Sequence, residues 1–361
     1  MDTAKTKIAI VSYSLGTGGA ERFAGTLGNM LESLGYEVHH IIVNNEVDYS
    51  FSGKLYNLGL ICDDCFWISK KIKKGFLLKK YLESEEINII IENRTRNLFL
   101  RDWFANSIYG KRKGYFMIHS FHLQNYLPKS VFLARKLYQK AIRIVCVSKS
   151  IEEQVSQKYG LNNTITIYNP IQSISIDSAK KTNVPENYIL FYGRLVDKVK
   201  NFTLLLNAFA QSKIYEKGMQ LVIMGDGVSK EKIEELIATL KLTNYVTLIP
   251  FQKEPFAYVK QAKFTILTSY YEGFPMSIIE SLSMGTPVVS VDCNSGPREV
   301  IVNERNGLLV ENHNVIALSN AMKRLAEDHE LYQYCKENAV ASVAHLAIDK
   351  IAAQWKKILE E

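Results

Sequence analysis

The sequence has few of the features that mark membrane-spanning or exported proteins. Its 361 residues contain no run of about 18 apolar residues, the length that a helix needs to cross a bilayer. The opening residues, Met-Asp-Thr-Ala-Lys-Thr-Lys-Ile, lack the apolar core of a signal peptide. We therefore expect a cytoplasmic protein without a transmembrane helix, which leaves open a peripheral position at the inner face of the cytoplasmic membrane.

Cysteine is also scarce, with five residues and a single C-x-x-C pair. No second pair and no cluster of histidines is present to complete a zinc site around that pair. The two aspartates between its cysteines raise rather than lower the pKa of a neighbouring thiol, which argues against a redox motif. We interpret all five cysteines as reduced and structural: Cys62, Cys65, Cys146, Cys293 and Cys335.

Length, hydrophobicity and charge indicate two domains with different partners. A chain of this length is too long for one ordinary core, and its hydrophobic fraction of 47 % is enough for two. Residues 1–170 contain 23 Lys and Arg against 15 Asp and Glu, whereas the remainder contains 21 against 22. We expect the basic half to face a phosphate-bearing substrate or a membrane surface, and we expect no nucleic-acid partner.

Each half alternates short apolar runs with amphipathic stretches, which is typical of parallel sheets covered by helices on both faces. In the first half the predicted strands are 8–13, 38–43, 87–91, 115–118 and 142–147, and the clearest helix is 20–34. In the second half they are 188–192, 220–224, 246–249, 264–267 and 287–291, with helices near 202–212 and 230–240. Residues 169–185 are predicted to form a linker. The pattern predicts an α/β protein with two Rossmann-like domains.

The most informative stretch of the chain is Glu272-Gly-Phe-Pro-Met-Ser-Ile-Ile-Glu280. Its two carboxylates flank a Gly/Pro loop that leads directly into an apolar helix. Backbone N–H groups at the start of a helix bind anions, and carboxylates accept hydrogen bonds from sugar hydroxyls. The stretch therefore predicts recognition of a sugar phosphate.

This glutamate pair resembles the E-x7-E signature of family 4 glycosyltransferases, which are retaining, use nucleotide sugars and have the GT-B fold. The similarity continues through Thr268-Ser-Tyr-Tyr before the pair and Gly285-Thr-Pro-Val-Val after it. The resemblance implies two Rossmann-like domains whose parallel sheets face a central cleft. It assigns 1–170 to an acceptor-side domain, with the C-terminal helix 346–361 packing back on it, and 171–345 to the donor-binding domain.

A glycine-rich loop follows the first predicted strand, with Gly16, Gly18 and Gly19 ahead of Glu21. Glycine lets the backbone approach a ligand closely, and the loop amides can face a phosphate. A dinucleotide-binding fingerprint needs a third glycine where Glu21 stands, so the dehydrogenase interpretation loses its main support. In the family that the chain resembles, this loop lies against the donor, which implies donor contacts for the three glycines; a tight structural turn is the alternative.

Two cations follow the first strand of the second half, in the segments Gly193-Arg-Leu and Lys200-Asn-Phe. An arginine and a lysine beyond a strand end can hold two phosphates and stabilise a departing nucleoside diphosphate without a metal ion. The segments resemble the family pattern Gly-Arg-Leu...Lys-Asn, which implies this role for Arg194 and Lys200. The spacing is one residue longer than the commonest form, so Lys198 remains an alternative to Lys200.

Further matches to the family concern the nucleotide and the sugar. Met224-Gly-Asp-Gly resembles the turn beside the nucleoside, Pro250-Phe stands where the base packs, and Gly296-Pro-Arg-Glu is similar to a loop near the sugar. The resemblance implies that Glu280 holds the ribose hydroxyls and Glu272 the sugar. The donor-binding residues implied in this domain are Gly193, Gly225, Phe251, Gly273, Phe274, Pro275, Met276, Ser277 and Glu280.

On the acceptor side, His119 follows the predicted strand 115–118. Open parallel sheets bind ligands at the carboxyl ends of their strands, and the ordinary pKa of histidine suits hydrogen bonding to a hydroxyl or a phosphate. The position resembles that of the active-site histidine of the family, which implies a catalytic role for His119. His122 is the alternative.

Lysines alternate with aromatic and aliphatic residues from Trp67 to Lys80, and Lys111-Arg-Lys adds a second basic segment. Such a face can lie on anionic lipid headgroups, where each lysine contributes roughly 1 kcal/mol. The alternative is an amphipathic helix that packs its apolar side inward.

Taken with the resemblance, these features predict a retaining hexosyltransferase. It would move a sugar from a nucleoside diphosphate, expected to be UDP, to a hydroxyl of a glycan or lipid-linked acceptor in cell-surface polysaccharide or glycoconjugate synthesis. The implied catalytic residues are His119, Arg194, Lys200 and Glu272. No Asp-x-Asp stands at a strand end, so neither a metal ion nor another cofactor is expected.

Several alternatives stay open at this point. Same-face attack and a covalent intermediate are both compatible with the sequence, which also leaves the sugar, the nucleotide, the acceptor and the oligomeric state open. Two other classes of protein remain: a nucleotide-sugar epimerase of the same fold, which needs no acceptor, and a non-catalytic two-domain sugar-binding protein.

Overall fold

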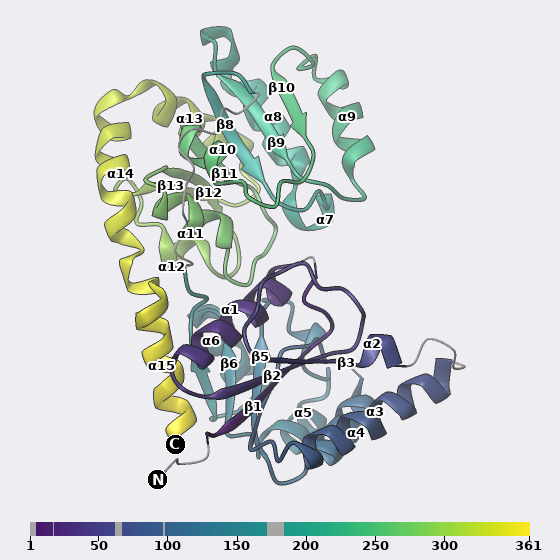
Figure 1. Ribbon diagram of the computed structural model, residues 1–361. Coiled ribbons are helices and arrows are strands. Elements are labelled where there is room, and N and C mark those ends of the chain that lie inside the picture. The colour runs from purple at the N-terminus through teal and green to yellow at the C-terminus, as the bar shows by residue number, and fades with distance from the viewer. Residues whose placement is uncertain (1–4, 17, 62–66, 97, 172–183) are drawn as a thin grey trace. The chain divides into compact units, whose positions relative to one another are not determined.

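The computed structural model describes residues 5–16, 18–61, 67–96, 98–171 and 184–361 (Figure 1). The chain divides into two compact units: unit 1 is Met1–Pro170 with Ile348–Glu361, and unit 2 is Ile171–Ala347. Each unit contains one sheet in which every pair of neighbouring strands is parallel. The α/β architecture with two Rossmann-like units agrees with the prediction. Most of the predicted linker lies outside the described residues.

Unit 1 is built on seven strands in the order β3-β2-β1-β4-β5-β6-β7. The strands are β1 Lys7–Ser12, β2 Glu37–Ile42, β3 Lys54–Asn57, β4 Ile89–Glu92, β5 Lys113–Ile118, β6 Arg143–Cys146 and β7 Thr164–Thr166. The helices are α1 Gly19–Ser33, α2 Leu58–Ile61, α3 Trp67–Ser84, α4 Phe99–Tyr109, η1 Leu123–Asn125, α5 Val131–Tyr138, α6 Lys149–Tyr159 and α15 Ile348–Glu360.

The order of the strands in unit 1 brings three distant segments to one edge. β4 lies between β1 and β5, with Ile8 beside Ile89 and Ile91 beside Tyr115. β4 is buried over its whole length, which explains why its first three residues are isoleucines; the fourth, Glu92, is a buried carboxylate. Because the strands are parallel, the residues that follow β1, β4 and β5 meet at the carboxyl edge of the sheet.

The last helix of the chain, α15, belongs to unit 1. Trp355 and Ile351 are fully buried, and the Tyr115 hydroxyl of β5 donates a hydrogen bond to the Ile358 carbonyl over 2.6 Å. The apolar residues of α15 lie on one face, as their helical spacing predicts. The helix therefore supplies part of the core of unit 1, 178 residues beyond Pro170 in the sequence.

Unit 2 repeats the same architecture with six strands in the order β10-β9-β8-β11-β12-β13. The strands are β8 Tyr188–Tyr192, β9 Gln220–Met224, β10 Val246–Ile249, β11 Phe264–Leu267, β12 Val288–Asp292 and β13 Gly307–Glu311. The helices are α7 Asp197–Lys200, α8 Phe202–Ser212, η2 Ile214–Lys217, α9 Lys230–Thr239, α10 Phe256–Gln261, α11 Met276–Ser283, α12 Pro297–Val300, α13 Val315–Glu327, α14 His329–Ser342 and η3 Ala344–Leu346.

The main core of unit 2 lies between its sheet and the helices α8, α9 and α13. Phe191 of β8 and Phe202 of α8 are buried there, with ring centroids 4.7 Å apart in an edge-to-face arrangement. The core holds β8 and α8 together, and the short loop between them carries the predicted phosphate-binding cations. No helix in the described part of the chain has the length and apolar character needed to span a bilayer.

Candidate active site

The carboxyl edge of the unit 2 sheet carries most of the residues predicted to bind a donor. Arg194 and Lys200 follow β8, Gly225 follows β9, and Glu272 follows β11. In unit 1, His119 takes the corresponding place after β5. Parallel strands end at the same edge, where open α/β sheets bind their ligands.

Two of the predicted catalytic residues, Lys200 and Glu272, form an ion pair. The Lys200 Nζ lies 2.7 Å from Glu272 Oε1, and the two side chains are 17 % and 13 % exposed. The Ser269 hydroxyl donates to the same carboxylate oxygen over 2.6 Å. The fold therefore fixes both groups in one place, and an anion that binds Lys200 shares the ammonium with Glu272.

The neighbouring cations, Arg194 and Lys198, are exposed. Neither side chain has a hydrogen-bond or ion-pair partner among the described residues. The carboxylate of Asp197 is engaged elsewhere, since it accepts from the Phe202 N–H over 2.7 Å and pairs with Lys232. Of the two lysines that the sequence leaves as alternatives, Lys200 is the one that the fold holds against another predicted site residue.

The loop before α11 is fixed from one side. The Ser295 hydroxyl donates to the Gly273 carbonyl over 2.7 Å. Gly296 packs so closely on Pro275 that a Cβ at Gly296 would lie 2.3 Å from the proline Cδ, and its φ of +100° favours glycine. Phe274 is buried beside them. The loop residues implied by the family resemblance therefore have a defined position.

α11 begins at Met276, and no side chain in the described part of the chain caps its N-terminus. Within the helix, Glu280 is 5 % exposed. The Tyr192 hydroxyl donates to the Ser277 carbonyl over 2.7 Å and lies 3.4 Å from Glu280 Oε2. Tyr192 was not predicted as a site residue; its place at the end of β8 is the signal that marks it. The uncapped start of α11 can bind an anion beside a buried carboxylate.

The predicted nucleoside turn packs directly on the turn at Gly193. A Cβ at Gly225 would lie 1.9 Å from the Gly193 carbonyl oxygen, and the φ of Gly225 is +152°. Phe251 is tied to the same turn, because its N–H donates to Asp226 Oδ2 over 2.8 Å, while 53 % of the residue stays exposed. Glycine at 225 is thus required by packing, and Phe251 stands on the surface.

In unit 1, His119 forms a hydrogen bond with Asn93, with 2.6 Å between His119 Nε2 and Asn93 Oδ1. Its ring packs edge-on against Phe23, with 5.2 Å between centroids. Burial, together with the positive charge of Arg96, lowers the pKa of His119 to about 3. The ring is therefore neutral at physiological pH. The alternative, His122, lies exposed in the loop that follows.

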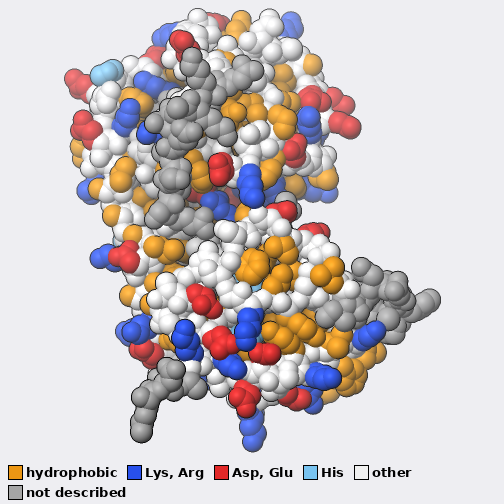
Figure 2. Space-filling view, in the orientation of Figure 1, with side chains coloured by type: hydrophobic (Ala, Val, Ile, Leu, Met, Phe, Trp, Pro, Cys, Tyr) orange, Lys and Arg blue, Asp and Glu red, His pale blue; other side chains and the backbone are white. Residues whose placement is uncertain are grey.

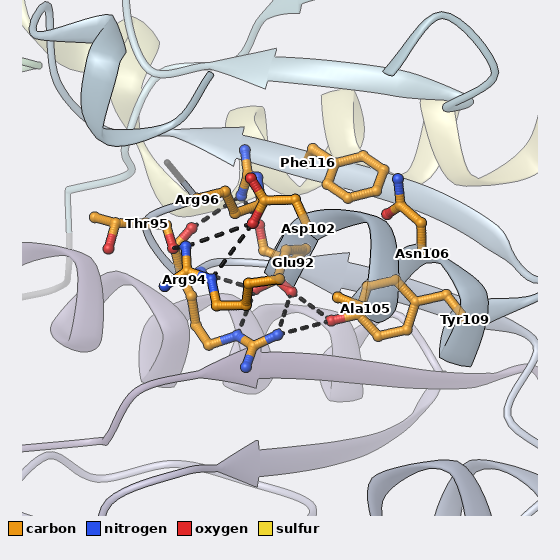
Figure 3. Close-up of a pocket in the computed structure, with 10 residues that line it drawn as sticks. Glu92, Arg94, Thr95, Arg96, Asp102, Ala105, Asn106, Tyr109 and Phe116 are labelled. Atoms are coloured by element: carbon orange, nitrogen blue, oxygen red, sulfur yellow. Dashed lines mark hydrogen bonds and ion pairs between the residues drawn. The ribbon is translucent and has the colours of Figure 1, made fainter. Parts of the chain in front are cut away.

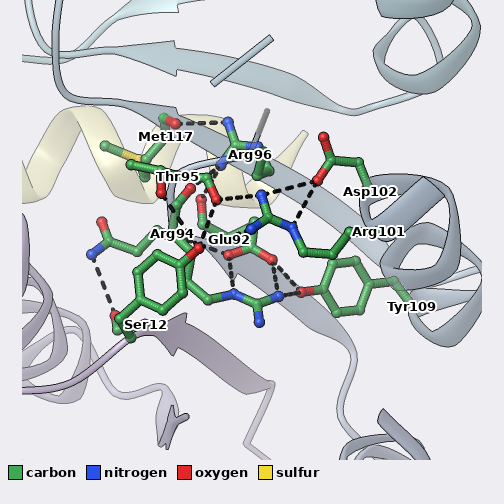
Figure 4. Close-up of polar contacts among 11 residues, drawn as sticks. Ser12, Glu92, Arg94, Thr95, Arg96, Arg101, Asp102, Tyr109 and Met117 are labelled. Carbon is green, nitrogen blue, oxygen red and sulfur yellow. Dashed lines mark hydrogen bonds and ion pairs between the residues drawn. The ribbon is translucent and has the colours of Figure 1, made fainter. Parts of the chain in front are cut away.

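An ion pair with a buried carboxylate lies at this edge of unit 1 (Figure 4). Arg94 donates through Nε and Nη2 to the two carboxylate oxygens of Glu92, over 2.9 and 2.7 Å. The Tyr109 hydroxyl of α4 also donates to Glu92. Burial opposes ionisation of Glu92, but the charges of Arg94 and Arg96 outweigh it and lower the pKa of the carboxyl group. The pair is thus ionised and holds the end of β4 to α4.

Arg96 fixes the loop after β4 from inside the fold. Its guanidinium donates to the carbonyl oxygens of Glu92, Arg94 and Met117 over 3.1, 2.9 and 2.8 Å. Asp102 lies near it at 3 % exposure, and burial raises the pKa of that carboxyl group. Figure 3 shows these side chains around a small cavity, which is lined by Glu92, Arg94, Thr95, Arg96, Arg101, Asp102, Ala105, Asn106, Tyr109 and Phe116.

The glycine loop of unit 1 is only partly held by side chains. The Gly16 N–H donates to Ser14 Oγ over 3.3 Å, and the Gly18 N–H to the Tyr49 hydroxyl over 3.4 Å. A Cβ at Gly19, the first residue of α1, would meet nothing within 4 Å. Donor contacts by Gly16, Gly18 and Gly19 stay a prediction.

With this geometry in view, the comparisons with known proteins identify the family. Residues 17–173 match Glycosyltransferase Family 4, and residues 173–341 match Glycosyl transferases group 1. The chain is 32 % identical over 366 residues to N-acetylgalactosamine-N,N'-diacetylbacillosaminyl-diphospho-undecaprenol 4-alpha-N-acetylgalactosaminyltransferase of Campylobacter jejuni, an alignment that covers 98 % of this chain and 99 % of that protein. The chain is a family 4 glycosyltransferase.

Solved structures agree with this assignment at the level of the fold. TarM from S. aureus, in a complex that contains UDP, superposes on the glycosyltransferase with a TM-score of 0.80 at 16 % identity, covering 99 % of this chain and 100 % of that one. Sucrose-phosphate synthase from Thermosynechococcus elongatus gives 0.82 at 20 % identity and covers 99 % and 98 %. The glycosyltransferase therefore has the GT-B fold.

One group of three side chains in the described part of the glycosyltransferase offers metal-ligand atoms close together, Glu37, His39 and Glu85. It lies away from the carboxyl edge, at the start of β2 and the end of α3. The Lys54 ammonium lies 2.9 Å from Glu37 and 3.3 Å from Glu85. The group is therefore explained as a salt-bridge network that joins β2, β3 and α3.

The described cysteines of the glycosyltransferase, Cys146, Cys293 and Cys335, are unpaired and buried. Burial raises the pKa of all three thiols, that of Cys335 to about 11. They are packing residues, as predicted. Cys62 and Cys65 lie outside the described residues.

Proposed function

We propose that this glycosyltransferase takes its sugar from a nucleoside diphosphate and releases the diphosphate at the carboxyl edge of unit 2. The observation that carries the proposal is the presence there of Arg194, Lys200 and the uncapped start of α11. A Cβ at Gly193 would lie 4.0 Å from Lys200 Cε, so the turn that precedes Arg194 adjoins the lysine side chain. Two cations and a helix N-terminus stabilise a departing diphosphate.

The remaining donor contacts follow from the same edge. Glu280, steadied by Tyr192, accepts hydrogen bonds from the ribose hydroxyls, and the exposed Phe251 packs against the base. Glu272 and the loop from Gly273 to Ser277 hold the sugar. The nucleotide we propose is UDP, because the TarM structure that shares this fold contains UDP.

We propose transfer with retention by attack on the same face of the sugar. The bond between C1 and the diphosphate oxygen breaks, the acceptor oxygen bonds to C1, and the acceptor proton passes to the departing phosphate oxygen. Glu272 is poorly suited to the alternative, a covalent intermediate. Lys200 and Ser269 both bind its carboxylate and reduce its nucleophilicity. The two cations supply the charge that a metal ion supplies elsewhere, so no metal ion or other cofactor takes part.

For the acceptor we propose a glycan carried on a lipid diphosphate, in polysaccharide or glycoconjugate synthesis. The C. jejuni relative is named for an undecaprenol-linked diphospho-sugar acceptor, and the alignment with it spans both proteins almost completely. The excess of Lys and Arg in residues 1–170 suits an anionic acceptor. His119 lies on this side of the enzyme.

We also propose that α3 and α4 meet an anionic membrane surface. Large apolar side chains are exposed there, with Phe76, Leu100 and Trp103 at 66, 76 and 56 %. Figure 2 shows hydrophobic side chains gathered over this part of unit 1. Gly75 packs on Phe104, so the two helices present one surface, which exposed lysines of α3 border. Exposed apolar side chains beside lysines are typical of proteins that lie on a bilayer.

The transferase proposal is tested with a panel of UDP-sugars and an undecaprenyl-diphosphate glycan as acceptor. We expect one donor to give a glycosidic product whose anomeric configuration, determined by NMR, equals that of the donor. Chelation by EDTA should leave the rate unchanged. An inverted product or loss of activity in EDTA would contradict the mechanism, and isomerisation of the donor without acceptor would identify an epimerase.

The membrane proposal is tested by flotation with vesicles of phosphatidylcholine alone and with added phosphatidylglycerol. We expect co-flotation with the anionic vesicles, which the double variant Leu100→Ser, Trp103→Ser loses. The matched control is Phe132→Ser, which removes an equally exposed apolar side chain from α5, at 72 % exposure, and should still float. Equal binding by all three proteins would contradict the proposal.

A further inference from the structure

Asn93, the residue after β4, is held in one orientation. It is 4 % exposed, and its Nδ2 donates to the Ala20 carbonyl over 2.9 Å and lies 3.3 Å from Ser12 Oγ. A carbonyl oxygen only accepts hydrogen bonds, so the amide nitrogen has to face Ala20. The amide oxygen of Asn93 therefore faces His119 and acts there as an acceptor.

This orientation of Asn93 fixes the tautomer of His119. His119 Nε2 lies 2.6 Å from an oxygen that only accepts, so Nε2 carries the hydrogen. A neutral ring with its proton on Nε2 has a lone pair on Nδ1. Within the described residues Nδ1 has no hydrogen-bond partner. It is also not one of the fully buried polar atoms that lack a partner, so Nδ1 is not sealed inside the fold.

The groups packed around the imidazole agree with a neutral ring. α1 contributes Phe23, and Tyr126, the residue after η1, lies 6.4 Å away between ring centroids. Burial raises the pKa of Tyr126 to about 12, so this phenol is neutral as well; Glu21, in the first turn of α1, acts on Tyr126. The charge that acts on the ring is that of Arg96, from the loop after β4, and it is positive.

We infer that Asn93 is a positioning residue, which sets the tautomer of His119 so that Nδ1 accepts a hydrogen bond from a substrate hydroxyl. The inference deepens the proposed function, on which the place of His119 in the site rests. A lone pair on Nδ1 accepts from a hydroxyl and repels a phosphate oxygen. Of the two groups that a histidine at this edge can bind, the geometry selects the hydroxyl.

The tautomer is measured by NMR on the full-length, unliganded enzyme labelled with ¹⁵N-histidine, and the His119 signals are identified by their absence in His119→Gln. We expect signals of the Nε2–H tautomer that do not change between about pH 5 and 8. In Asn93→Asp, a carboxylate faces the ring and favours the imidazolium. A titration of His119 should then appear in this range, and kcat/KM should fall by at least about fivefold from pH 8 to pH 6.

Asn163→Asp is the matched control. The side-chain amide of Asn163, like that of Asn93, donates within unit 1, in this case to the carbonyl oxygens of Tyr138 and Ala141 over 3.0 and 2.8 Å. Among the described residues it forms no hydrogen bond with a histidine. Its replacement should lower stability without altering the pH profile of kcat/KM. If Asn93→Asp and Asn163→Asp share one pH profile, Asn93 has only a structural role.

His119→Gln tests the acceptor itself. Glutamine keeps a donor for Asn93 but has no acceptor in the place of Nδ1, so we expect an unchanged Tm and a fall in kcat/KM of at least about tenfold. Full activity of this variant, or an Nδ1–H tautomer in the wild type, overturns the inference. The NMR measurement needs no substrate, so it decides the role of Asn93 even if no nucleotide sugar supports transfer and the proposed function fails.

Discussion

The two units end their parallel strands in different ways. At the carboxyl edge of unit 1, charged groups bind one another and the backbone: the buried Glu92 binds Arg94, whose side chain is 18 % exposed, and the buried Arg96 binds three carbonyl oxygens. At the same edge of unit 2, Lys200 and Glu272 are partly exposed, and Arg194 has no partner in the described part of the chain. Unit 1 thus uses charge to hold its surface in shape, whereas unit 2 keeps charge within reach of a ligand.

The strongest test of this difference between the units is to remove the ion pair between Glu92 and Arg94 in unit 1. Glu92→Gln leaves the Arg94 guanidinium without its counter-charge, so we expect the free energy of unfolding of unit 1 to fall by about 3–5 kcal/mol. Trp67, Trp103 and Trp355 all belong to unit 1, so urea unfolding followed by tryptophan fluorescence reports on this unit. Glu83→Gln, which removes an exposed carboxylate of α3, is the control and should cost about 0–1 kcal/mol. If Glu92→Gln and Glu83→Gln lost the same free energy of unfolding, the ion pair at Glu92 would not stabilise unit 1 more than an exposed carboxylate does.

In unit 2 the same kind of change should affect catalysis more than stability. Lys200→Ala removes one of the two cations proposed to hold the diphosphate, and we expect kcat/KM to fall about 10²–10³-fold, or roughly 3–4 kcal/mol. Lys198→Ala, two residues away and exposed, is the matched control and should retain most of the activity. Steady-state rates at saturating acceptor give kcat/KM for both variants. A larger loss at Lys198 would transfer the role to that residue.

Unit 1 should also be the acid-sensitive half. Burial lowers the pKa of His40 to about 4, below the ordinary value of 6.5. Between these values the unfolded chain binds a proton at His40 that the folded chain does not. The contribution of His40 to the free energy of unfolding therefore falls as pH drops from about 6.5 to 4 and then levels off. The loss from this group is about 3 kcal/mol. Tryptophan-monitored urea titrations at several pH values measure it, and the slope should be shallower in His40→Leu.

The smallest expected effects concern helix caps, one in each unit. Asn314 Oδ1 accepts from the Ala317 N–H at the start of α13 over 2.9 Å, and Ser148 Oγ accepts from the Ile151 N–H at the start of α6 over 3.4 Å. Replacement of either residue by alanine should cost about 1 kcal/mol, and more at Asn314 because its bond is shorter. Asn314→Ala should shift unfolding measured by far-UV circular dichroism and leave the tryptophan transition in place. A shift of both signals would show that the units unfold together.

Most of the strands that the sequence predicts correctly are buried; β10, which is buried only at Val246, is the exception. The run 220–224 is β9 and the run 264–267 is β11, because strands covered on both faces are rich in apolar residues. β3, β7 and β13 were not predicted. Each lies at an edge of its sheet and contains partly or fully exposed residues. The pairing of β3 with β2 and of β7 with β6 comes from the fold and not from a local pattern.

The residues of the candidate site also fall into two groups: those that a local sequence pattern predicts and those that only the fold brings together. The glutamate pair, the cations and the glycine turns stand in short continuous segments, so a local pattern finds them. Asn93 has no such pattern, since its partners Ala20 and His119 are 73 and 26 residues away. The helix α3 is a mixed case. Leu78 and Leu82 pack inward as an amphipathic helix predicts, but Phe76 stays outside, and only the arrangement of neighbouring helices decides which residues are covered.

The placement of α15 has a consequence for how the chain is made. Residues 348–361 are translated after the whole of unit 2, yet Trp355 and Ile358 fill the interior of unit 1, whose other residues precede unit 2 in the sequence. The nascent residues of unit 1 therefore lack α15, and part of their core stays unfilled, until unit 2 and α15 have been synthesised. A stop codon at position 348 would therefore damage unit 1, although most of that unit is encoded before unit 2.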